Sequence, residues 1–240
     1  MENKKKFLSI LFPVLFYGAL WGIFEATLGT LLHLPAFEAG GLFTKSSIIM
    51  VPVAFLIMTL CYKKTGSLIS VVFAGLISAT IKLSTAIVVP FGIYVYFPAI
   101  YIVVESLAMF GALAIFRPSN VLSTKTFAAF VTAAVTYQFT YISICSITAV
   151  AAPGLTGNIN AFESMANWKK VGEKYLFTYN GVAIIYALAL GGAAYGISKL
   201  LTKLNVETKF DYKRILNSPI TASATLAVAF ALTISLSLVK

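Results

Sequence analysis

The stretch LSILFPVLFYGALWGIFEATLGTLLH, residues 8–33, decides the fold class of this chain. It is longer than the roughly 20 apolar residues that a helix needs to cross a bilayer. A basic leader precedes it, as in a secretory signal, but the run exceeds the about 7–15 apolar residues of such a signal and has no small-residue cleavage site. We therefore interpret residues 8–33 as a retained first membrane span. One carboxylate, Glu25, interrupts the span, and the only histidine, His33, ends it.

The rest of the chain is as apolar as this first stretch. Of its 240 residues, 59% are hydrophobic and 11% are charged, and the mean hydropathy is +0.91. These values exceed those of a soluble globular domain and indicate an integral membrane protein. No linker divides the chain, so we expect one all-α transmembrane domain, residues 1–240, with a six-helix core and one C-terminal span. The seven predicted spans are about 8–33, 46–62, 67–89, 98–116, 126–151, 176–200 and 217–239.

The cations predict the orientation of the spans. They collect in short connectors between apolar runs, which favours a role in orienting the protein over nucleic-acid binding. With a cytoplasmic N-terminus, Lys45, Lys169, Lys170, Lys174 and Lys240 lie outside. The larger set lies inside: Lys4, Lys5, Lys6, Lys63, Lys64, Arg117, Lys125, Lys199, Lys203, Lys209, Lys213 and Arg214.

Three ionisable residues lie within predicted spans: Glu25, Lys82 and Glu105. Such residues are rare at membrane depth and usually face the interior of a bundle or an aqueous cavity. At about 1.5 Å per residue, each is expected in the outer half of its span, at a similar level. They therefore predict a pocket for a small polar solute, reached from outside.

Other polar side chains are expected to contribute to this pocket. They are Tyr137, Gln138 and Tyr141 near the middle of the fifth span and Asn180 near the outer end of the sixth. The long external connector 153–177 carries Trp168, which serves either as an interfacial anchor or as part of a lid over the site.

A stripe of small residues accompanies Glu25. Residues seven apart differ by only about 20° around a helix, so Gly18 and Glu25 share a face, with Gly22, Ala26 and Gly29 beside them. Small residues let helices approach closely, which predicts that Glu25 points into protein. Two alternatives give Glu25 and Lys82 no ligand to bind. In one, the two residues form a structural ion pair; in the other, Lys82 extends towards the outer surface.

Several catalytic signatures are missing from the sequence. There is no G-x-x-x-x-G-K-[ST] loop and no G-x-S-x-G elbow. One histidine and one aspartate, Asp211, do not make up a histidine-rich or aspartate-rich metal motif. Cys61 and Cys145 lack a Cys-x-x-Cys spacing. We expect no enzyme activity, no cofactor and no bound metal.

The stretch LWGIFEATLGTLLHLP, residues 20–35, resembles the first helix of some uncharacterised S components of energy-coupling factor (ECF) transporters. The layout of the first six spans is also similar, whereas the seventh span departs from the usual six. The resemblance implies a vitamin or micronutrient uptake component in a prokaryotic cytoplasmic membrane. It also implies a transmembrane coupling protein and two cytoplasmic ATPases as partners. Small-residue faces would dock onto that coupling protein, here Gly18, Gly22 and Ala26, or Ala189 and Ala193.

Two other functions fit the same residues. A self-sufficient secondary transporter would use a buried glutamate that is protonated during its cycle. A structural or assembly protein of the membrane would bind no ligand.

Overall fold

The structure is a computed structural model, and every element that it describes is helical. It describes residues 2–31, 46–90, 92–119, 123–151 and 215–238, with scattered residues between 181 and 192. The elements are α1 (Glu2–Leu31), α3 (Ser46–Thr65), α4 (Ile69–Leu83), the short 3-10 helix η2 (Ser84–Ile87), α5 (Ile93–Phe116), α6 (Thr124–Ala151) and α12 (Pro219–Ser237). The predicted all-α class is therefore confirmed.

Six of the seven predicted spans coincide with described helices. The predicted third span, 67–89, is divided between α4 and η2. The predicted seventh span is α12, where Ser218 accepts a hydrogen bond from the Thr221 backbone N–H at 3.4 Å and Pro219 follows directly. A side-chain oxygen before a proline at the first helical position is a strong start signal. The predicted sixth span, 176–200, lies largely outside the described residues.

The fourth described α-helix begins before the predicted fourth span. Residue 98 was expected to begin it, but α5 begins at Ile93 and holds Pro98 inside the helix. Pro98 is the sixth residue of α5, where a proline removes one backbone hydrogen bond and crowds the carbonyl of residue 94, a disturbance that membrane helices tolerate. Because the helix begins earlier in the sequence, Glu105 lies at the middle of the span Val95–Phe116, and not nearer to its N-terminal end as predicted.

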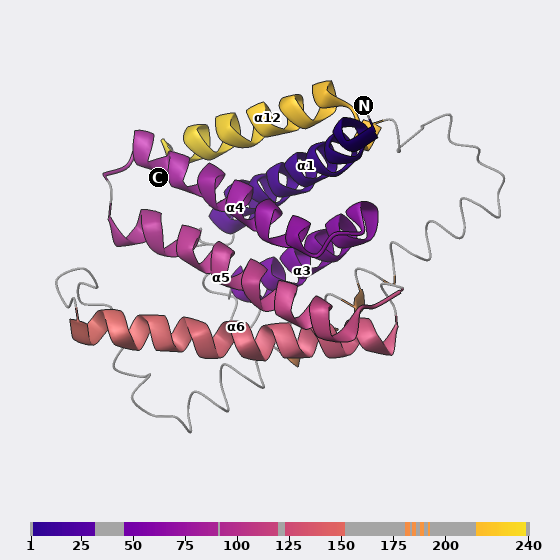
Figure 1. The fold of residues 1–240 in the computed structure, drawn as a ribbon. Helices are drawn as coiled ribbons and strands as arrows, with labels where there is room; N and C mark the ends of the chain where they lie inside the picture. Colours follow the sequence, from indigo (N-terminus) through magenta and orange to yellow (C-terminus); the bar gives the residue numbers. More distant parts are fainter. Residues whose placement is uncertain are drawn as a thin grey trace.

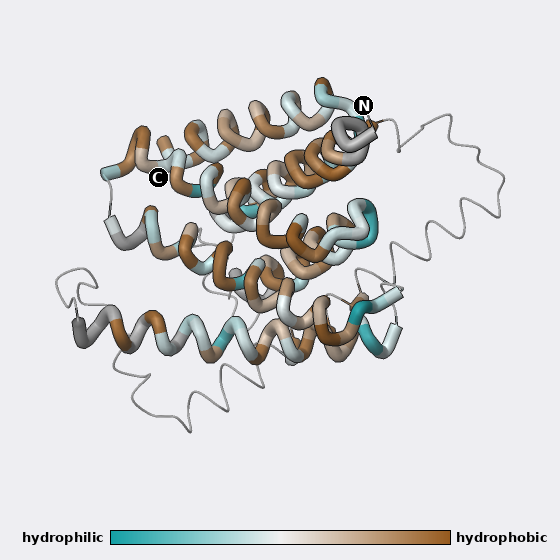
Figure 2. Tube along the Cα trace, in the orientation of Figure 1, coloured by the Kyte–Doolittle hydropathy of each residue, from teal (hydrophilic) through white to brown (hydrophobic). Residues whose placement is uncertain are grey.

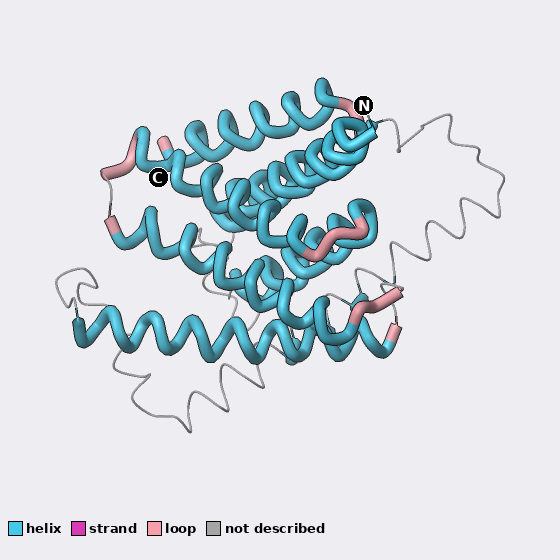
Figure 3. The backbone as a smooth tube through the Cα atoms, in the orientation of Figure 1, coloured by secondary structure: helices cyan, strands magenta, loops and turns pink. Residues whose placement is uncertain are grey.

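The described helices pack side by side in the order α12, α1, α4, α5 and α6, and α3 packs against α1 and α4 (Figure 1). The N-terminus, the α3–α4 turn and the α5–α6 connector lie at the same end of this bundle, at the right of Figures 1 and 3. Lys63, Lys64, Arg117 and Lys125 belong to those connectors or adjoin them. The arrangement gathers these cations at one end, as the predicted orientation requires.

Four of the described helical segments are long and apolar enough to cross a membrane. They are Phe7–Gly29, Ile69–Ile87, Val95–Phe116 and Pro219–Ser237. Apolar residues dominate along the helices, and strongly hydrophilic residues mark the turns at the right-hand end (Figure 2). The chain is therefore a multi-pass membrane protein.

Glycines set the distance between α1 and α4. A Cβ atom added to Gly18 would lie 2.8 Å from Ile77 Cβ, and one added to Gly22 would lie 2.7 Å from Ile81 Cδ1. Both distances are shorter than real Cβ atoms show, and at Gly18 the backbone oxygen of Ala74 is also only 2.9 Å away, so only glycine permits the approach there. The predicted small-residue contact of the first span is present, and its partner is α4.

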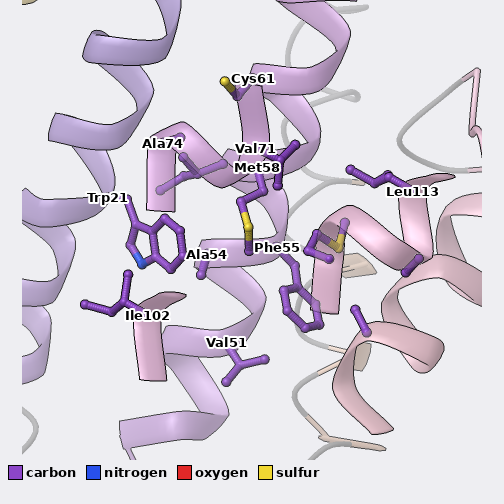
Figure 4. Close-up of a cluster of buried hydrophobic side chains, with 14 of the residues drawn as sticks. Trp21, Val51, Ala54, Phe55, Met58, Cys61, Val71, Ala74, Ile102 and Leu113 are labelled. Atoms are coloured by element: carbon purple, nitrogen blue, oxygen red, sulfur yellow. The ribbon is translucent and has the colours of Figure 1, made fainter. Parts of the chain in front are cut away.

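A second close approach joins α4 to α5. A Cβ atom on Gly75 would collide with the side chain of Ser106, which is itself fully buried. The fully buried indole of Trp21 lies near this contact, beside Ile102 and Ala74 in the core (Figure 4). Trp21 thereby brings α1 to the junction of α4 and α5.

Gly75→Ala is expected to lower the free energy of unfolding by about 1–3 kcal/mol, because α4 and α5 must move apart to admit the methyl group. The matched control is Gly111→Ala in α5, where a Cβ atom meets nothing within 4 Å. That control should be neutral or stabilising by up to about 1 kcal/mol through helix propensity. Thermal unfolding of both variants in detergent checks this. Equal Tm values for the two variants would contradict the close packing at Gly75.

Candidate functional site

The three predicted ionisable residues come from three different helices and share one neighbourhood. Glu25 lies on α1, Lys82 on α4 and Glu105 on α5. Glu25 interacts electrostatically with Lys82, and Glu105 interacts electrostatically with Glu25. Glu105 is only 5% exposed, whereas Glu25 and Lys82 are partly buried. The structure brings these three predicted site residues together.

The glycine contacts explain why Glu25 reaches Lys82. Gly18 faces Ala74 and Ile77, and Gly22 faces Ile81, so α1 and α4 run in the same direction. Continuing this alignment places Glu25 level with residues 81–84, the end of α4 and the start of η2, and this range holds Lys82. The contacts of Gly18 and Gly22 set the register of α1 against α4, and this register brings Glu25 to Lys82.

Glu105 joins the pair from an antiparallel helix. Because Gly75 is opposite Ser106, the Cα atom of Glu105 lies about six residues, or roughly 9 Å, from the level of Lys82. Side chains tilt towards the N-terminus of their own helix. Since α4 and α5 run in opposite directions (Figure 1), this tilt shortens the separation between the two levels, and the charge that acts on Glu105 is that of Glu25.

Trp21 holds Glu25 in place and was missed by sequence reasoning. Its indole Nε1–H donates a hydrogen bond of 3.3 Å to Glu25 Oε1. The two residues are four positions apart, so they lie one above the other on the same helix face. That spacing in WGIFE was the signal that could have identified Trp21.

Two buried polar atoms of this region have no hydrogen-bond partner among the described residues. They are Glu105 Oε1 on α5 and Ser78 Oγ on α4. Ser78 is fully buried and lies one turn before Lys82 on the same face of α4. Buried polar atoms are normally paired, and leaving a carboxylate oxygen unpaired costs more than leaving a neutral group unpaired. Ser78 was not predicted, because a serine in a span is usually unremarkable.

An aromatic group adjoins Glu105 on the α6 side. The ring of Tyr101 lies 4.4 Å from that of Tyr141, and Tyr137 lies 6.2 Å from Tyr141. Tyr101 is four residues before Glu105, so the two share a face of α5. Gln138, 7% exposed, is on α6 between the two tyrosines in sequence. Tyr137, Gln138 and Tyr141 were predicted for the pocket, whereas Tyr101, which packs against Tyr141, was not.

The remaining predicted residues are divided. Asn180, Trp168 and His33 lie outside the described residues. The alternative docking face of Gly18 and Gly22 is covered by α4. Ala26 is also buried, whereas Ala189 is exposed and Ala193 lies outside the described residues.

The charges of this junction suit a small polar molecule better than a metal ion. Two carboxylates and one ammonium group have a net charge of −1 when all three are ionised. Within the described ranges, no group of three or more His, Cys, Asp and Glu side chains is arranged to hold a metal ion. The junction can offer a carboxylate acceptor, a hydroxyl group, a cation and aromatic rings to a small molecule.

Comparisons with protein families, with curated proteins and with solved structures found no match to this chain.

A double-mutant cycle should show that Glu25 and Lys82 are coupled. Lys82→Met alone leaves two acids without their cation, so Glu25→Gln should cost less in the Lys82→Met background than in the wild type. The expected coupling is about 0.5–3 kcal/mol, measured by denaturation in detergent. The matched cycle replaces the exposed Lys63 by Met and should be additive with Glu25→Gln. Additivity in both cycles would contradict the interaction.

Proposed function

We propose that this chain is a membrane-embedded binding and uptake component for a small polar solute. The observation that carries the proposal is the meeting of Glu25, Lys82 and Glu105 from three helices, with Glu105 buried and one of its oxygens unpaired among the described residues. The cost of placing ionisable groups at membrane depth supports a functional role over packing alone.

The chemistry of the junction supports a polar ligand with charged groups of its own. Lys82 suits a carboxylate or phosphate, and Glu25 and Glu105 suit an amine or another donor. Tyr137, Gln138 and Tyr141 supply ring faces and hydrogen-bonding groups beside Glu105. The aromatic group lies towards the N-terminal end of α5, which the predicted orientation places outside. A solute would then arrive from outside, pass these rings and reach the acids.

The resemblance of residues 20–35 to S components of ECF transporters supports a transporter in which solute capture and ATP hydrolysis belong to separate proteins. In this proposal the chain captures the solute, a separate transmembrane protein couples it to cytoplasmic ATPases, and ATP hydrolysis drives reorientation. Because α4 covers Gly18 and Gly22, the exposed Ala189 is the better candidate for the docking face.

The test is mass spectrometry of small molecules retained by the detergent-purified protein. The wild-type chain should retain a solute that Glu25→Gln and Lys82→Met release, because each variant removes a charge from the junction. Two matched controls should retain it. Glu2→Gln makes the same change about 35 Å away along α1, and Lys63→Met removes an exposed lysine. The proposal fails if nothing is retained and no member of a metabolite panel changes the Tm.

A second candidate is a self-sufficient proton-coupled transporter, which the surplus of acids over cations in the junction favours. In it, Glu105 would gain and lose a proton during each cycle. Purified chain alone in liposomes should then take up the retained solute under an imposed proton gradient, and Glu105→Gln should abolish that uptake. Uptake that appears only with co-purified ATPases and ATP would exclude this candidate and support the ECF-like one.

A further inference from the structure

The missing partner of Glu105 must be a hydrogen-bond donor. A carboxylate oxygen can only accept hydrogen bonds. Glu105 Oε1 receives none from the described residues, although the side chain is only 5% exposed. The Ser78 hydroxyl, on the helix packed against α5, is unpaired in the same way. Two buried oxygens on helices that pack together thus lack a partner among the described residues. A group with more than one polar hydrogen would satisfy both.

The charge of that group should be positive. Lys82 can balance only one of the two carboxylates, Glu25 and Glu105, with which it shares the junction. With both acids ionised, one negative charge has no counterion among the described residues, and a buried charge is stable only when it is paired. A cationic donor satisfies the charge and the hydrogen bonds together.

The aromatic neighbours indicate an organic cation. Tyr101 is one helical turn from Glu105. The ring centroid of Tyr101 lies 4.4 Å from that of Tyr141 and 5.4 Å from that of Phe97, which packs edge-on against Tyr101. The faces of such rings attract ammonium groups and also pack against their alkyl substituents. An alkali or alkaline-earth ion would instead need a shell of several oxygens, which rings do not provide.

We infer that the α1–α4–α5 junction binds a primary or secondary ammonium group, held by Glu105 and Ser78 and facing the rings of Tyr101 and Tyr141. This inference rests on the proposed function and names the class of its solute. An N–H-bearing ammonium is preferred over a quaternary one, because a quaternary nitrogen has no hydrogen to donate to the two unpaired oxygens.

The test compares four probes on the detergent-purified full chain at equal ionic strength: n-propylammonium chloride, tetramethylammonium chloride, sodium propionate and sodium chloride. The readouts are the Tm and the Kd by calorimetry. Propylammonium should raise the Tm most, tetramethylammonium less, and propionate no more than sodium chloride.

Variants then assign the contacts. Glu105→Gln, which keeps the shape of the side chain, should weaken propylammonium binding at least about tenfold through loss of a charge-assisted hydrogen bond. Tyr101→Leu should weaken it about 3- to 30-fold, and Tyr101→Phe, which keeps the ring, should stay close to wild type. Phe127→Leu, an exposed aromatic on α6, is the matched control and should change nothing. If Glu105→Gln misfolds, Ser78→Ala tests the same site by removing its other unpaired oxygen.

Three outcomes overturn the inference. One is an equal Tm shift from propionate or sodium chloride. Another is full propylammonium binding by Glu105→Gln together with loss of proton-driven uptake, which would make a proton the missing partner. The third is a retained solute that is anionic or neutral yet depends on Glu25 and Lys82, in which case the proposed function stands and the ammonium inference falls. If no probe binds and nothing is retained, both fall.

Discussion

The close approach of α1 to α4 is the constraint on which the rest of this structure depends. Gly18 and Gly22 leave no room for a side chain against Ile77 and Ile81. In a bilayer, helices gain little from hydrophobic burial against one another, so small residues that allow dense packing are a principal source of association. This contact fixes the register of the two helices, and the register brings Glu25 to Lys82.

The same contact carries α1 to α5 through Trp21. The indole fills the space beside Gly75 and Ser106, and its N–H binds the Glu25 carboxylate. A single side chain thus joins the apolar core to the charged junction. The ionisable groups are tolerated there because neighbouring helices screen them from the hydrocarbon and because Glu25 and Lys82 carry opposite charges. The unpaired oxygen of Glu105 is the exception to this balance.

Sequence reasoning located six of the described helices and three ionisable residues that lie on neighbouring helices. The ionisable residues were evident because charge within an apolar run is conspicuous. Helix α5 begins at Ile93, five residues before the predicted span, because a membrane helix tolerates Pro98 in its interior. Ser78 and Tyr101 were missed as site residues because serine and tyrosine are common in spans, and only their neighbours show what they contact.

The sequence by itself determined a multi-pass helical membrane protein with acids and a lysine at membrane depth. Run length and hydropathy are sufficient for this, since each span satisfies its backbone hydrogen bonds internally and independently of its neighbours. Only the tertiary structure decided that α12 packs on α1, that α4 covers the glycine stripe and that Glu105 lies within range of the Glu25 charge. Those pairings depend on side-chain shapes from distant parts of the chain, and helical periodicity, which repeats about every 3.6 residues, contains no information about which faces meet.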